Sequence, residues 1–510
     1  IEVLDEVVLA PIGFVFAPLS ALLGVAKQVV KDFVVKAIEH FTGIDFDLIG
    51  AEGVRRFRRF SEALADLVVV HGGSLSGEHG DGQARSELLP RMYGHDLVRL
   101  FERAKAVWDP DDGLNPGMLV RPARLDENLR FAPLPREPVA VAFGYPHDNG
   151  DFSAAVRRCV GVAKCRTTAV SPGDPAVMCP SFRATGAEQH STRGRARLLH
   201  EMLAGGVDAT ARSKNRADRT RDPADRRRPA EPGGPVDVVI TEGWRSTEVR
   251  DALDLCLSCK GCRSDCPVGV DMATYKAEFL HHHYQGRLRP AAHYTMGWLP
   301  RWLRAASALR LAGAMNAAAR ITPLAGLAKR LGGIAPERDI PRLPRETFRR
   351  WFARGAGGPE AANTGPVAAA APPPGAAAEQ DTRTVLWPDT FTDHLSPEVG
   401  RAAVRVLQDA GRRVALPPEG VCCGLTYIST GQLDRARAVL RRTLDLLDTA
   451  GVWQAPEGGV RPVVVLEPSC AGALRTDLPE LLPGDPRARR LAASVRTFAQ
   501  ALEEQAPNWQ

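Results

Sequence analysis

Four cysteines in the middle of this 510-residue chain follow the spacing C-x2-C-x2-C-x3-C, and a proline comes directly after the last of them. They are Cys256, Cys259, Cys262 and Cys266. Three thiolates at this spacing bind one face of an iron–sulfur cubane, and the thiolate before the proline commonly ligates a second cluster. A structural zinc site instead usually takes its ligands from two cysteine pairs, or from cysteines together with histidines. The spacing therefore predicts an iron–sulfur site and a second Cys-Pro pair.

The second pair is Cys179-Pro180, and Cys159 and Cys165 lie upstream of it. Cys159 and Cys165 keep the frame of C-x2-C-x2-C, but Val162 stands at the middle position and cannot bind iron. This second set is therefore one thiolate short. Its cluster either contains three irons or takes a ligand other than cysteine, such as water or an imidazole, for which His190 is a candidate.

Two pairings of the proline-linked cysteines remain open. In the crossed pairing, one cluster takes Cys256, Cys259, Cys262 and Cys179, and the other takes Cys159, Cys165 and Cys266. In the uncrossed pairing, Cys266 stays with its own motif, and Cys159, Cys165 and Cys179 form the deficient set. Both pairings predict one [4Fe-4S] cluster and a second cluster that is [4Fe-4S] or [3Fe-4S].

Composition indicates a reducing compartment. Ten cysteines gathered in ligand spacings are typical of metal binding rather than of disulfides. We therefore expect a cytoplasmic protein, with association at the cytoplasmic face of the membrane left open. A basic run from Arg212 to Arg228 is mixed with Asp and Pro and has no aromatic residues, which indicates a disordered insert within residues 205–235. No nucleic-acid partner is expected.

The chain starts with an apolar stretch. Residues 7–26 carry no charged side chain and are long enough for a helix that crosses a bilayer. Pro11, Gly13 and Pro18 interrupt this pattern, so a pair of helices on a membrane surface competes with a true span. Because the first residue is Ile1, we expect a truncated chain.

Composition and periodicity divide the rest of the chain. Residues 51–135 should hold helices at Glu52–Leu67 and Leu89–Trp108 around a Gly-rich loop, after uncertain apolar helices in residues 1–50. The remaining parts are an iron–sulfur domain at 136–300, a helical segment at 301–355, an Ala/Pro/Gly linker at 356–382 and a last domain at 383–510.

The last domain alternates between short apolar runs and helical periodicity. Strands are expected at residues 385–387, 414–416 and 463–466, with helices at 397–411 and 432–450 between them. This alternation predicts a parallel sheet in an α/β arrangement.

Two regions resemble known families. The motif Gly77-Glu78-His79-Gly80-Asp81-Gly82 and the motif Leu114-Asn115-Pro116-Gly117 resemble the end of the cap domain in FAD-linked D-lactate and D-2-hydroxyglutarate dehydrogenases. The cysteine domain and Cys422-Cys423-Gly424 resemble the iron–sulfur subunit of glycolate oxidase and the cysteine-rich (CCG) domain of heterodisulfide reductases. Together they look like the fused flavin and iron–sulfur dehydrogenases of bacteria, over roughly residues 55 to 505.

This resemblance implies the fold class. It is an α+β multidomain chain with a remnant of the FAD-linked oxidase cap, a mainly helical ferredoxin-like two-cluster domain and an α/β CCG half-domain. It also implies that His79 takes the substrate hydroxyl proton while Glu78 binds a divalent metal ion, with Asn115 and Gly117 at the cofactor. Arg85 is a candidate for the substrate carboxylate. The plain alternative is that Glu78 and His79 are loop residues held by turn hydrogen bonds.

The chain also departs from these families. The large FAD-binding domain and a His-bearing strand should precede the cap, and neither is found before residue 55. A second Cys-Cys-Gly half would normally follow the first. We therefore expect a chain truncated at both ends that binds no FAD alone, whereas the full-length parent would bind FAD and a divalent metal ion.

Three thiols remain, Cys422, Cys423 and Cys470. Adjacent cysteines do not readily form a disulfide with each other, so a shared metal ion or cluster is one interpretation. Cys470 is followed by Ala471, Gly472 and Ala473 rather than by the further C-x2-C of the family, so buried free thiols are the other interpretation.

Two further segments are expected to have structural rather than functional roles. His281, His282 and His283 cannot share one helix face, so surface or partly packed histidines are expected rather than a metal site. Residues 298–331 form an amphipathic basic segment. It should pack on the protein's own core, and docking to an anionic membrane near a quinone or cytochrome partner is the alternative.

The sequence thus predicts an oxidoreductase acting on the CH-OH group of 2-hydroxyacids. The chain would be its electron-transfer part, which passes electrons from reduced flavin, bound in cis or in trans, through iron–sulfur clusters to a quinone or cytochrome. A non-catalytic iron–sulfur carrier or scaffold without its flavin domain is the alternative. Which 2-hydroxyacid reacts is not determined by these residues.

Overall fold

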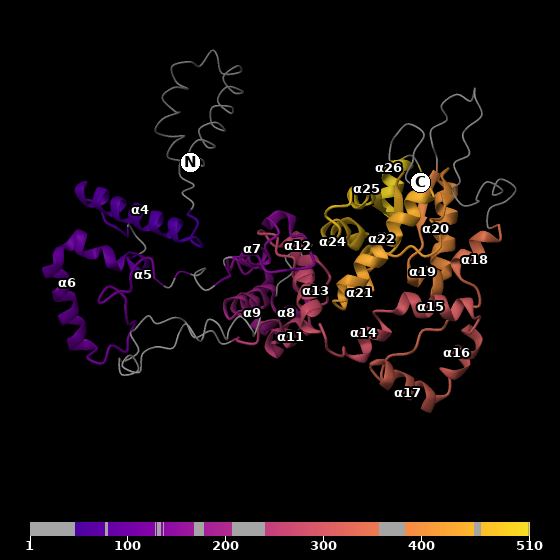
Figure 1. Ribbon diagram of the computed structural model, residues 1–510, viewed down its shortest axis with the longest axis horizontal. Helices are drawn as coiled ribbons and strands as arrows, with labels where there is room; N and C mark the ends of the chain where they lie inside the picture. The colour runs from indigo at the N-terminus through magenta and orange to yellow at the C-terminus, as the bar shows by residue number, and fades with distance from the viewer. Residues whose placement is uncertain are drawn as a thin grey trace, which may run out of the picture. The chain divides into compact units, whose positions relative to one another are not determined.

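The computed structural model describes residues 46–76, 80–127, 129, 134–135, 137–167, 178–206, 240–355, 383–452, 461–507 and 509. The apolar stretch at 7–26, the linker at 356–382 and most of the basic insert lie outside the described residues. The chain divides into two compact units, the first comprising residues 1–136 and 223–236 and the second comprising residues 137–222 and 237–510. Figure 1 shows the elements of both units along the chain.

The first unit is built on two long helices. They are α4 (Ala51–Val70) and α6 (Leu89–Trp108), with the short helices α5 (Gly82–Arg85) and η3 (Ser86–Leu88) before α6. The expected helix at Glu52–Leu67 is confirmed, and the one at Leu89–Trp108 is confirmed with a break at Gly94, whose φ of 76° and ψ of 159° are not helical. A small core joins Ala65 of α4 to Leu88 and Leu125, with Phe57 and Leu75 packed against it.

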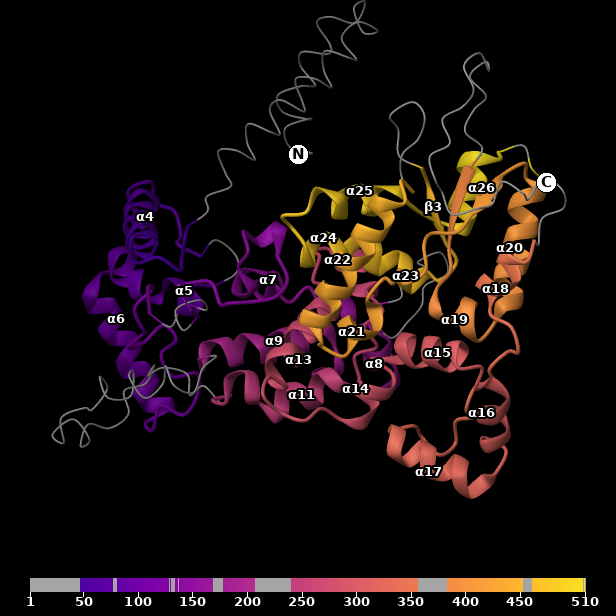
Figure 2. The ribbon, with the colours of Figure 1, turned by 45° about the vertical axis from the view of Figure 1, so that its right-hand side comes forward.

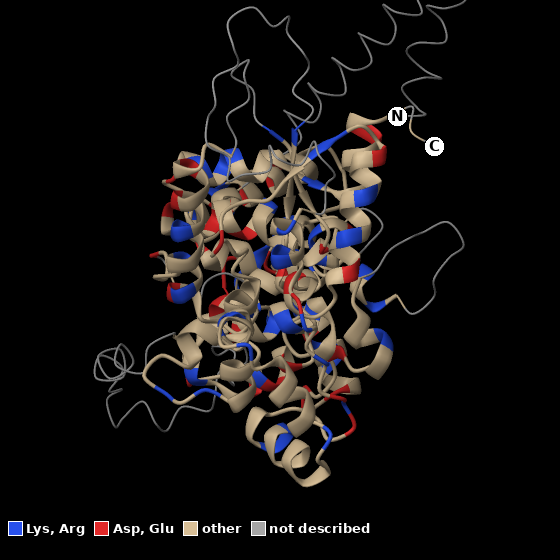
Figure 3. Cartoon of the chain, turned by 90° about the vertical axis from the view of Figure 1, so that its right-hand side faces the viewer, with Lys and Arg blue, Asp and Glu red and all other residues tan. Residues whose placement is uncertain are grey.

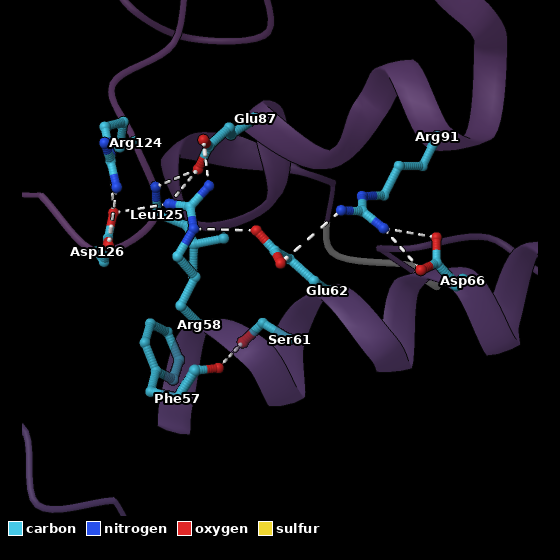
Figure 4. Close-up of polar contacts among 10 residues, drawn as sticks. All are labelled: Phe57, Arg58, Ser61, Glu62, Asp66, Glu87, Arg91, Arg124, Leu125 and Asp126. Atoms are coloured by element: carbon cyan, nitrogen blue, oxygen red, sulfur yellow. Dashed lines mark hydrogen bonds and ion pairs between the residues drawn. The ribbon is translucent and has the colours of Figure 1, made fainter. Parts of the chain in front are cut away.

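Arg58 organises the polar contacts of this unit (Figure 4). Its guanidinium lies 2.9 Å from Glu62, 2.7 Å from Glu87 and 2.7 Å from Asp126. Glu87 also accepts the backbone N–H of Leu125 at 2.7 Å. One half-buried cation therefore joins α4 to η3 and to the loop that follows α6.

The second unit begins with short helices around the cysteine loops. They are η4 (Pro146–Asp148), α7 (Phe152–Arg157), η5 (Lys164–Arg166), α8 (Pro180–Thr185), η6 (Glu188–His190), α9 (Thr192–Ala204), η8 (Gly243–Arg245), α11 (Thr247–Asp254), α12 (Gly261–Asp265) and α13 (Met272–His283). Their core is aromatic. Phe152 stacks on Trp244 with ring centroids 5.6 Å apart and meets Tyr275 edge to face.

Glu278 anchors the segment that enters this unit. Its carboxylate is fully buried and accepts the backbone N–H groups of Ala142 at 2.7 Å and Phe143 at 2.9 Å. Arg437 donates to the carbonyl of Ala142, and the next residue, Gly144, donates to the carbonyl of Glu480 at 2.7 Å. Residues more than a hundred positions away along the chain thus hold residues 142–144, through two side chains and one backbone carbonyl.

A four-stranded parallel sheet forms the C-terminal part of the same unit. Its strands are β1 (Arg383–Trp387), β2 (Arg413–Ala415), β3 (Val463–Val465) and β4 (Val495–Thr497), in the order β2-β1-β3-β4. Val385 pairs with Ala415 on one side and with Val463 on the other. The three expected strands and their parallel pairing are confirmed, and β4 is an addition.

Helices connect and cover these strands. They are α19 (Thr390–His394), α20 (Pro397–Asp409), α21 (Leu425–Ser429), α22 (Leu433–Thr449), α23 (Pro468–Gly472), the π-helical turn η10 (Ala473–Asp477), α24 (Leu478–Leu481), α25 (Pro486–Ser494) and α26 (Phe498–Gln505). One core cluster joins Leu386 and Val464 of the sheet to Val404 of α20 and Ala501 of α26. Figures 1 and 2 place α22 on the other side of the sheet.

Five helices connect the cysteine loops to the sheet. They are α14 (Ala291–Thr295), α15 (Leu299–Ala308), α16 (Ala312–Ala318), α17 (Thr322–Gly332) and α18 (Phe348–Ala353). Phe348 of α18 is fully buried against the sheet cluster, whereas α16 has no buried residue. Within the described part of the chain, every helix is too short or too polar to cross a membrane.

Candidate metal centres

Two cysteine loops in the second unit repeat one backbone conformation. The first loop is residues 159–165 and the second is residues 256–262, so that Val162 takes the place of Cys259. Both of these side chains are exposed, and a short helix begins near the end of each loop, η5 in the first and α12 in the second.

Backbone angles carry this repeat. Gly161 (φ 87°) and Ala163 (φ 67°) of the first loop correspond to Ser258 (φ 54°) and Lys260 (φ 58°) of the second. Three of these four residues have side chains, for which positive φ is disfavoured. Such strain persists where the surrounding structure requires it and clusters at ligand sites. The first loop therefore keeps the conformation of a cluster loop although its middle thiol is missing.

The second loop surrounds a buried thiol. The backbone N–H of Met272 donates to Sγ of Cys262 at 3.4 Å. Burial raises the pKa of the Cys262 thiol to about 12, and Asp271, Cys256 and Cys259 contribute to that rise. A bound metal ion removes such a proton by supplying positive charge. The thiol and its N–H donor therefore suit a cluster ligand.

Two lysines lie at the same loop, Lys260 within it and Lys276 beside it. Nζ of Lys260 lies 3.0 Å from Asp271 and 2.7 Å from Asp477. Nζ of Lys276 donates to the carbonyl oxygens of Cys256 at 2.7 Å and Asp254 at 3.1 Å. Lys260 is thus neutralised by two carboxylates, whereas Lys276 brings positive charge close to Cys256, which favours an anionic cluster.

The first loop has a similar sulfur contact. The backbone N–H of Arg193 donates to Sγ of Cys165 at 3.3 Å. Burial raises the pKa of the Cys165 thiol, and the neighbouring thiols of Cys179 and Cys159 add to that rise. These three thiols are therefore electrostatic neighbours.

Arg195 is a site residue that the sequence did not indicate. Its side chain is buried, with one nitrogen 3.6 Å from Sγ of Cys179 and others bonded to Ser181 at 2.9 Å and to the carbonyl of Ala252 at 2.7 Å. Burial alone would raise the pKa of Cys179, but hydrogen bonds from Ser181 and Thr192, together with Arg195, make the net shift downward. A buried cation at this thiol favours its ionised, metal-binding form.

His190 lies beside Cys179 through its backbone rather than its ring. Its carbonyl oxygen accepts hydrogen bonds from Ser181 at 2.9 Å and from Sγ of Cys179 at 3.4 Å. Its ring Nδ1 lies 3.0 Å from the Thr185 hydroxyl, and its Nε2 lies 3.4 Å from Gln189. The imidazole would have to leave these partners to bind iron.

The cysteine thiols of the two loops are the type of ligand that iron–sulfur clusters require. Cys266 closes the second loop, with its N–H donating to the carbonyl of Cys262 at 3.0 Å. Among the described residues, no three His, Cys, Asp or Glu side chains converge tightly enough to chelate a single ion. The thiols gather in two neighbourhoods with N–H donors and cations around them, and such surroundings tune clusters.

The remaining three thiols line a cavity of about 250 Å³. It lies at the carboxyl ends of β1 and β3, where the strand order reverses, which is the usual ligand position in open α/β sheets. Sγ of Cys423 and Sγ of Cys470 are 3.0 Å apart. A hydrogen bond with Cys423 raises the pKa of the Cys422 thiol, and burial raises it further.

The cavity is connected to the second cysteine loop by a continuous helical segment. Helices α23, η10 and α24 follow one another from Cys470 to Leu481. Asp477 of this segment binds Lys260, and Glu480 binds Arg263 at 2.9 Å. Burial raises the pKa of Asp477 to about 6 although Lys260 opposes the shift.

In the first unit, Gly77, Glu78 and His79 lie outside the described residues, so the proposed base and metal ligand stay predictions. Asn115 and Gly117 form a turn with positive φ angles of 48° and 77°. The side chain of Arg85 donates to the carbonyl of Gly80 at 3.3 Å.

The three consecutive histidines are packed separately. His282 stacks on Trp244 with centroids 4.3 Å apart and lies 3.0 Å from Glu278. His283 is buried, and its Nδ1 lies 2.9 Å from the carbonyl oxygen of Trp244. Their rings therefore serve packing, in line with the expectation of partly packed side chains.

Three family models match the chain in order. Residues 40–119 match the C-terminal domain of FAD linked oxidases, residues 155–270 match a 4Fe-4S dicluster domain, and residues 389–475 match a cysteine-rich domain. The predicted combination of cap, iron–sulfur and CCG regions is confirmed. No solved structure matches the chain.

Three curated relatives match different shares of this chain. A D-2-hydroxyglutarate dehydrogenase of Pseudomonas putida is 29% identical over 88% of this chain and 42% of its own length. The Escherichia coli protein of that name is 27% identical over 80% of this chain and 38% of its own length. One component of the anaerobic glycerol-3-phosphate dehydrogenase of Escherichia coli is 25% identical over 37% of this chain and 43% of its own length. The chain thus spans about two fifths of the length of the two D-2-hydroxyglutarate dehydrogenases.

Proposed function

We propose that this chain is the electron-transfer part of an FAD-dependent D-2-hydroxyacid dehydrogenase. The observation that carries the proposal is the repeated conformation of the two cysteine loops in one compact unit with the cavity of Cys422, Cys423 and Cys470. The relatives named D-2-hydroxyglutarate dehydrogenase support a 2-hydroxyacid as the substrate class. The acceptor we propose is a quinone or cytochrome, and the location is the cytoplasm.

Each residue group has a defined part in this proposal. Iron–sulfur clusters supply one-electron transfer when bound. Cys256, Cys259, Cys262 and Cys266 would hold the complete cluster, and Cys159, Cys165 and Cys179 the deficient one. The buried cation of Arg195 would compensate the negative charge at Cys179, and Lys276 would do the same at Cys256 in the second loop.

Exchanging the residue at position 162 tests the proposal. The chain is expressed anaerobically, and iron, sulfide and electron paramagnetic resonance spectra are measured before and after reduction by dithionite. We expect about seven to eight irons per chain and a three-iron signal before reduction. Val162→Cys should raise the iron content by about one and remove that signal, because it supplies the missing thiolate.

Cys259→Ser serves as the matched loss variant in the second loop. It should lower the iron content and alter the four-iron signal, whereas Val162→Ala should leave both unchanged. Zinc in place of iron, or a three-iron signal that survives Val162→Cys unchanged, would contradict the proposal. Flavin is quantified on the same samples. Bound flavin would show that this chain binds FAD without a separate flavin domain.

A further inference from the structure

One stretch of the second unit carries positive charge without any acidic residue. Residues 279–336 contain eight Arg and Lys side chains and no Asp or Glu. The whole chain has 60 acidic residues in 510, so a stretch of this length would ordinarily contain about seven. The stretch covers α14, α15, α16 and α17, and in Figure 3 the helices at the lower end of the view are tan and blue, with red on the chain beside them.

The same stretch exposes large apolar side chains. In α17, Leu324, Leu327 and Leu331 are 49%, 54% and 69% exposed, and their spacing of three and four residues places them on one helix face. Before α16, Leu309 is 68% exposed. Only Gly332 of α17 is buried. The expected packing of the whole segment on the core is therefore wrong for these leucines.

Three arginines of the same stretch have no charged or polar partner among the residues that the structure describes. The side chains of Arg310, Arg320 and Arg330 are exposed and form no hydrogen bond or ion pair with any residue that the structure describes. Other cations of the stretch serve the fold. Arg289 donates to the carbonyl of Gly431, and Arg304 donates to the carbonyl of Val421.

An exposed apolar helix face in the same stretch as arginines without a partner among the described residues matches the surface of an anionic bilayer. The leucines can enter the boundary of the acyl chains while the arginines reach the lipid phosphates. A transmembrane position does not fit, because α17 has 11 residues and a spanning helix needs about 20. No acidic side chain within the stretch repels anionic lipid, and the exposed Glu337 and Asp339 follow directly after it.

We propose that the surface formed by Leu309, Arg310, Arg320, Leu324, Leu327, Arg330 and Leu331, here called the basic apolar surface, binds the face of a membrane rich in anionic phospholipid. Lipid binding at this surface does not depend on electron transfer, so the proposal is independent of the function proposed above.

Vesicle sedimentation with the full chain tests this inference. Vesicles of phosphatidylglycerol and phosphatidylcholine should bind the chain, vesicles of phosphatidylcholine alone should bind it weakly, and added salt should reduce the binding. Each arginine near an anionic surface strengthens binding about fivefold, so Arg310→Gln, Arg320→Gln and Arg330→Gln together should weaken it about a hundredfold. These side chains have no partners to lose among the residues that the structure describes, so the variant should fold.

The matched control carries the same charge change on other helices. Arg405 in α20 and Arg489 and Arg490 in α25 are also exposed, and their replacement by Gln should have a much smaller effect on binding. A second variant, Leu324→Gln with Leu327→Gln and Leu331→Gln, should weaken binding at least tenfold. Its control replaces Leu67 and Leu100 in the first unit, which are 56% and 53% exposed.

Two results would overturn the inference. One is equal loss of binding in the basic apolar variants and in their controls. The other is concentration-dependent self-association without vesicles that the leucine variant abolishes, which would assign the surface to a second copy of the chain. Circular dichroism of each variant separates loss of binding from loss of fold.

Discussion

Glu278→Gln tests how the second unit holds the segment that enters it. The buried carboxylate accepts two backbone N–H groups, from Ala142 at 2.7 Å and Phe143 at 2.9 Å, and its Oε1 also lies 3.0 Å from His282. A glutamine has the same shape but only one oxygen. Whichever way its amide turns, the NH2 group faces one of the two backbone donors.

The magnitude follows from that count. One charge-assisted hydrogen bond is lost, and one buried N–H group is left without an acceptor, which together cost about 3 kcal/mol. Glu278→Ala leaves both donors unpaired and opens a cavity, for a cost of about 5 kcal/mol. A change of about 3 kcal/mol corresponds to a factor of roughly a hundred in the local opening equilibrium.

Hydrogen exchange of the peptide that contains Ala142 and Phe143 measures this directly. Both amides are protected in the parent chain because the carboxylate holds them. In Glu278→Gln, at least one should exchange about a hundredfold faster. The control is Glu201→Gln in α9, whose partner Arg197 is exposed, so that about 0.5 kcal/mol or less is lost. Unchanged protection in Glu278→Gln would refute the reasoning.

Three further predictions concern separate parts of the chain. Because burial raises the pKa of Asp477 from 3.8 to about 6, the folded chain keeps this proton longer than the unfolded chain as pH rises. The free energy of unfolding should therefore fall by about 3 kcal/mol between about pH 4 and about pH 6.5, a fall that urea titrations of Asp477→Asn should lack. Gly424→Ala should destabilise the sheet domain by about 1 to 2 kcal/mol because its φ is 75°, whereas Gly472→Ala, in a helix with open space around it, should be neutral or slightly stabilising in the same titration. Arg58→Met should destabilise the first unit by about 2 kcal/mol in thermal unfolding by leaving three carboxylates without their shared cation, and Arg91→Met, on a more exposed ion pair, by less than about 1 kcal/mol.

Local patterns account for what the sequence predicted correctly. The apolar residues of helices α4 and α6 recur at helical spacing, and strands β1, β2 and β3 are short apolar runs between helices. Residues close in sequence are therefore enough to predict each of these elements. Strand β4 is only Val-Arg-Thr, which has neither an apolar run nor turn residues around it. It becomes a strand because β3 offers an open edge beside it.

Long-range contacts account for what the sequence did not predict. Arg195 meets Cys179 across 16 residues, and Asp477 meets Lys260 across more than two hundred. The sequence around a charged helical residue does not show whether that residue is buried, because its partner lies far away in the sequence and is brought close only by folding. The sequence also did not predict the positive φ angles at matching positions of the two cysteine loops, although the spacing of Cys159 and Cys165 already placed Val162 at the missing position.

The helix that starts at the thiol cavity gives the electron-transfer proposal a structural consequence. From Cys470 to Asp477 the chain rises about 1.5 Å per residue, or about 10 Å in all. Asp477 is buried and binds Lys260, which lies between Cys259 and Cys262. One rigid segment, rather than a flexible linker, therefore fixes the cavity of Cys423 and Cys470 relative to the second cysteine loop. Sites that exchange electrons benefit from such a fixed separation, because rigid elements hold functional groups more accurately than loops. The ion pair would thus set a distance as well as stabilise the fold, and its loss in Asp477→Ala should affect transfer between the two sites before it affects iron content.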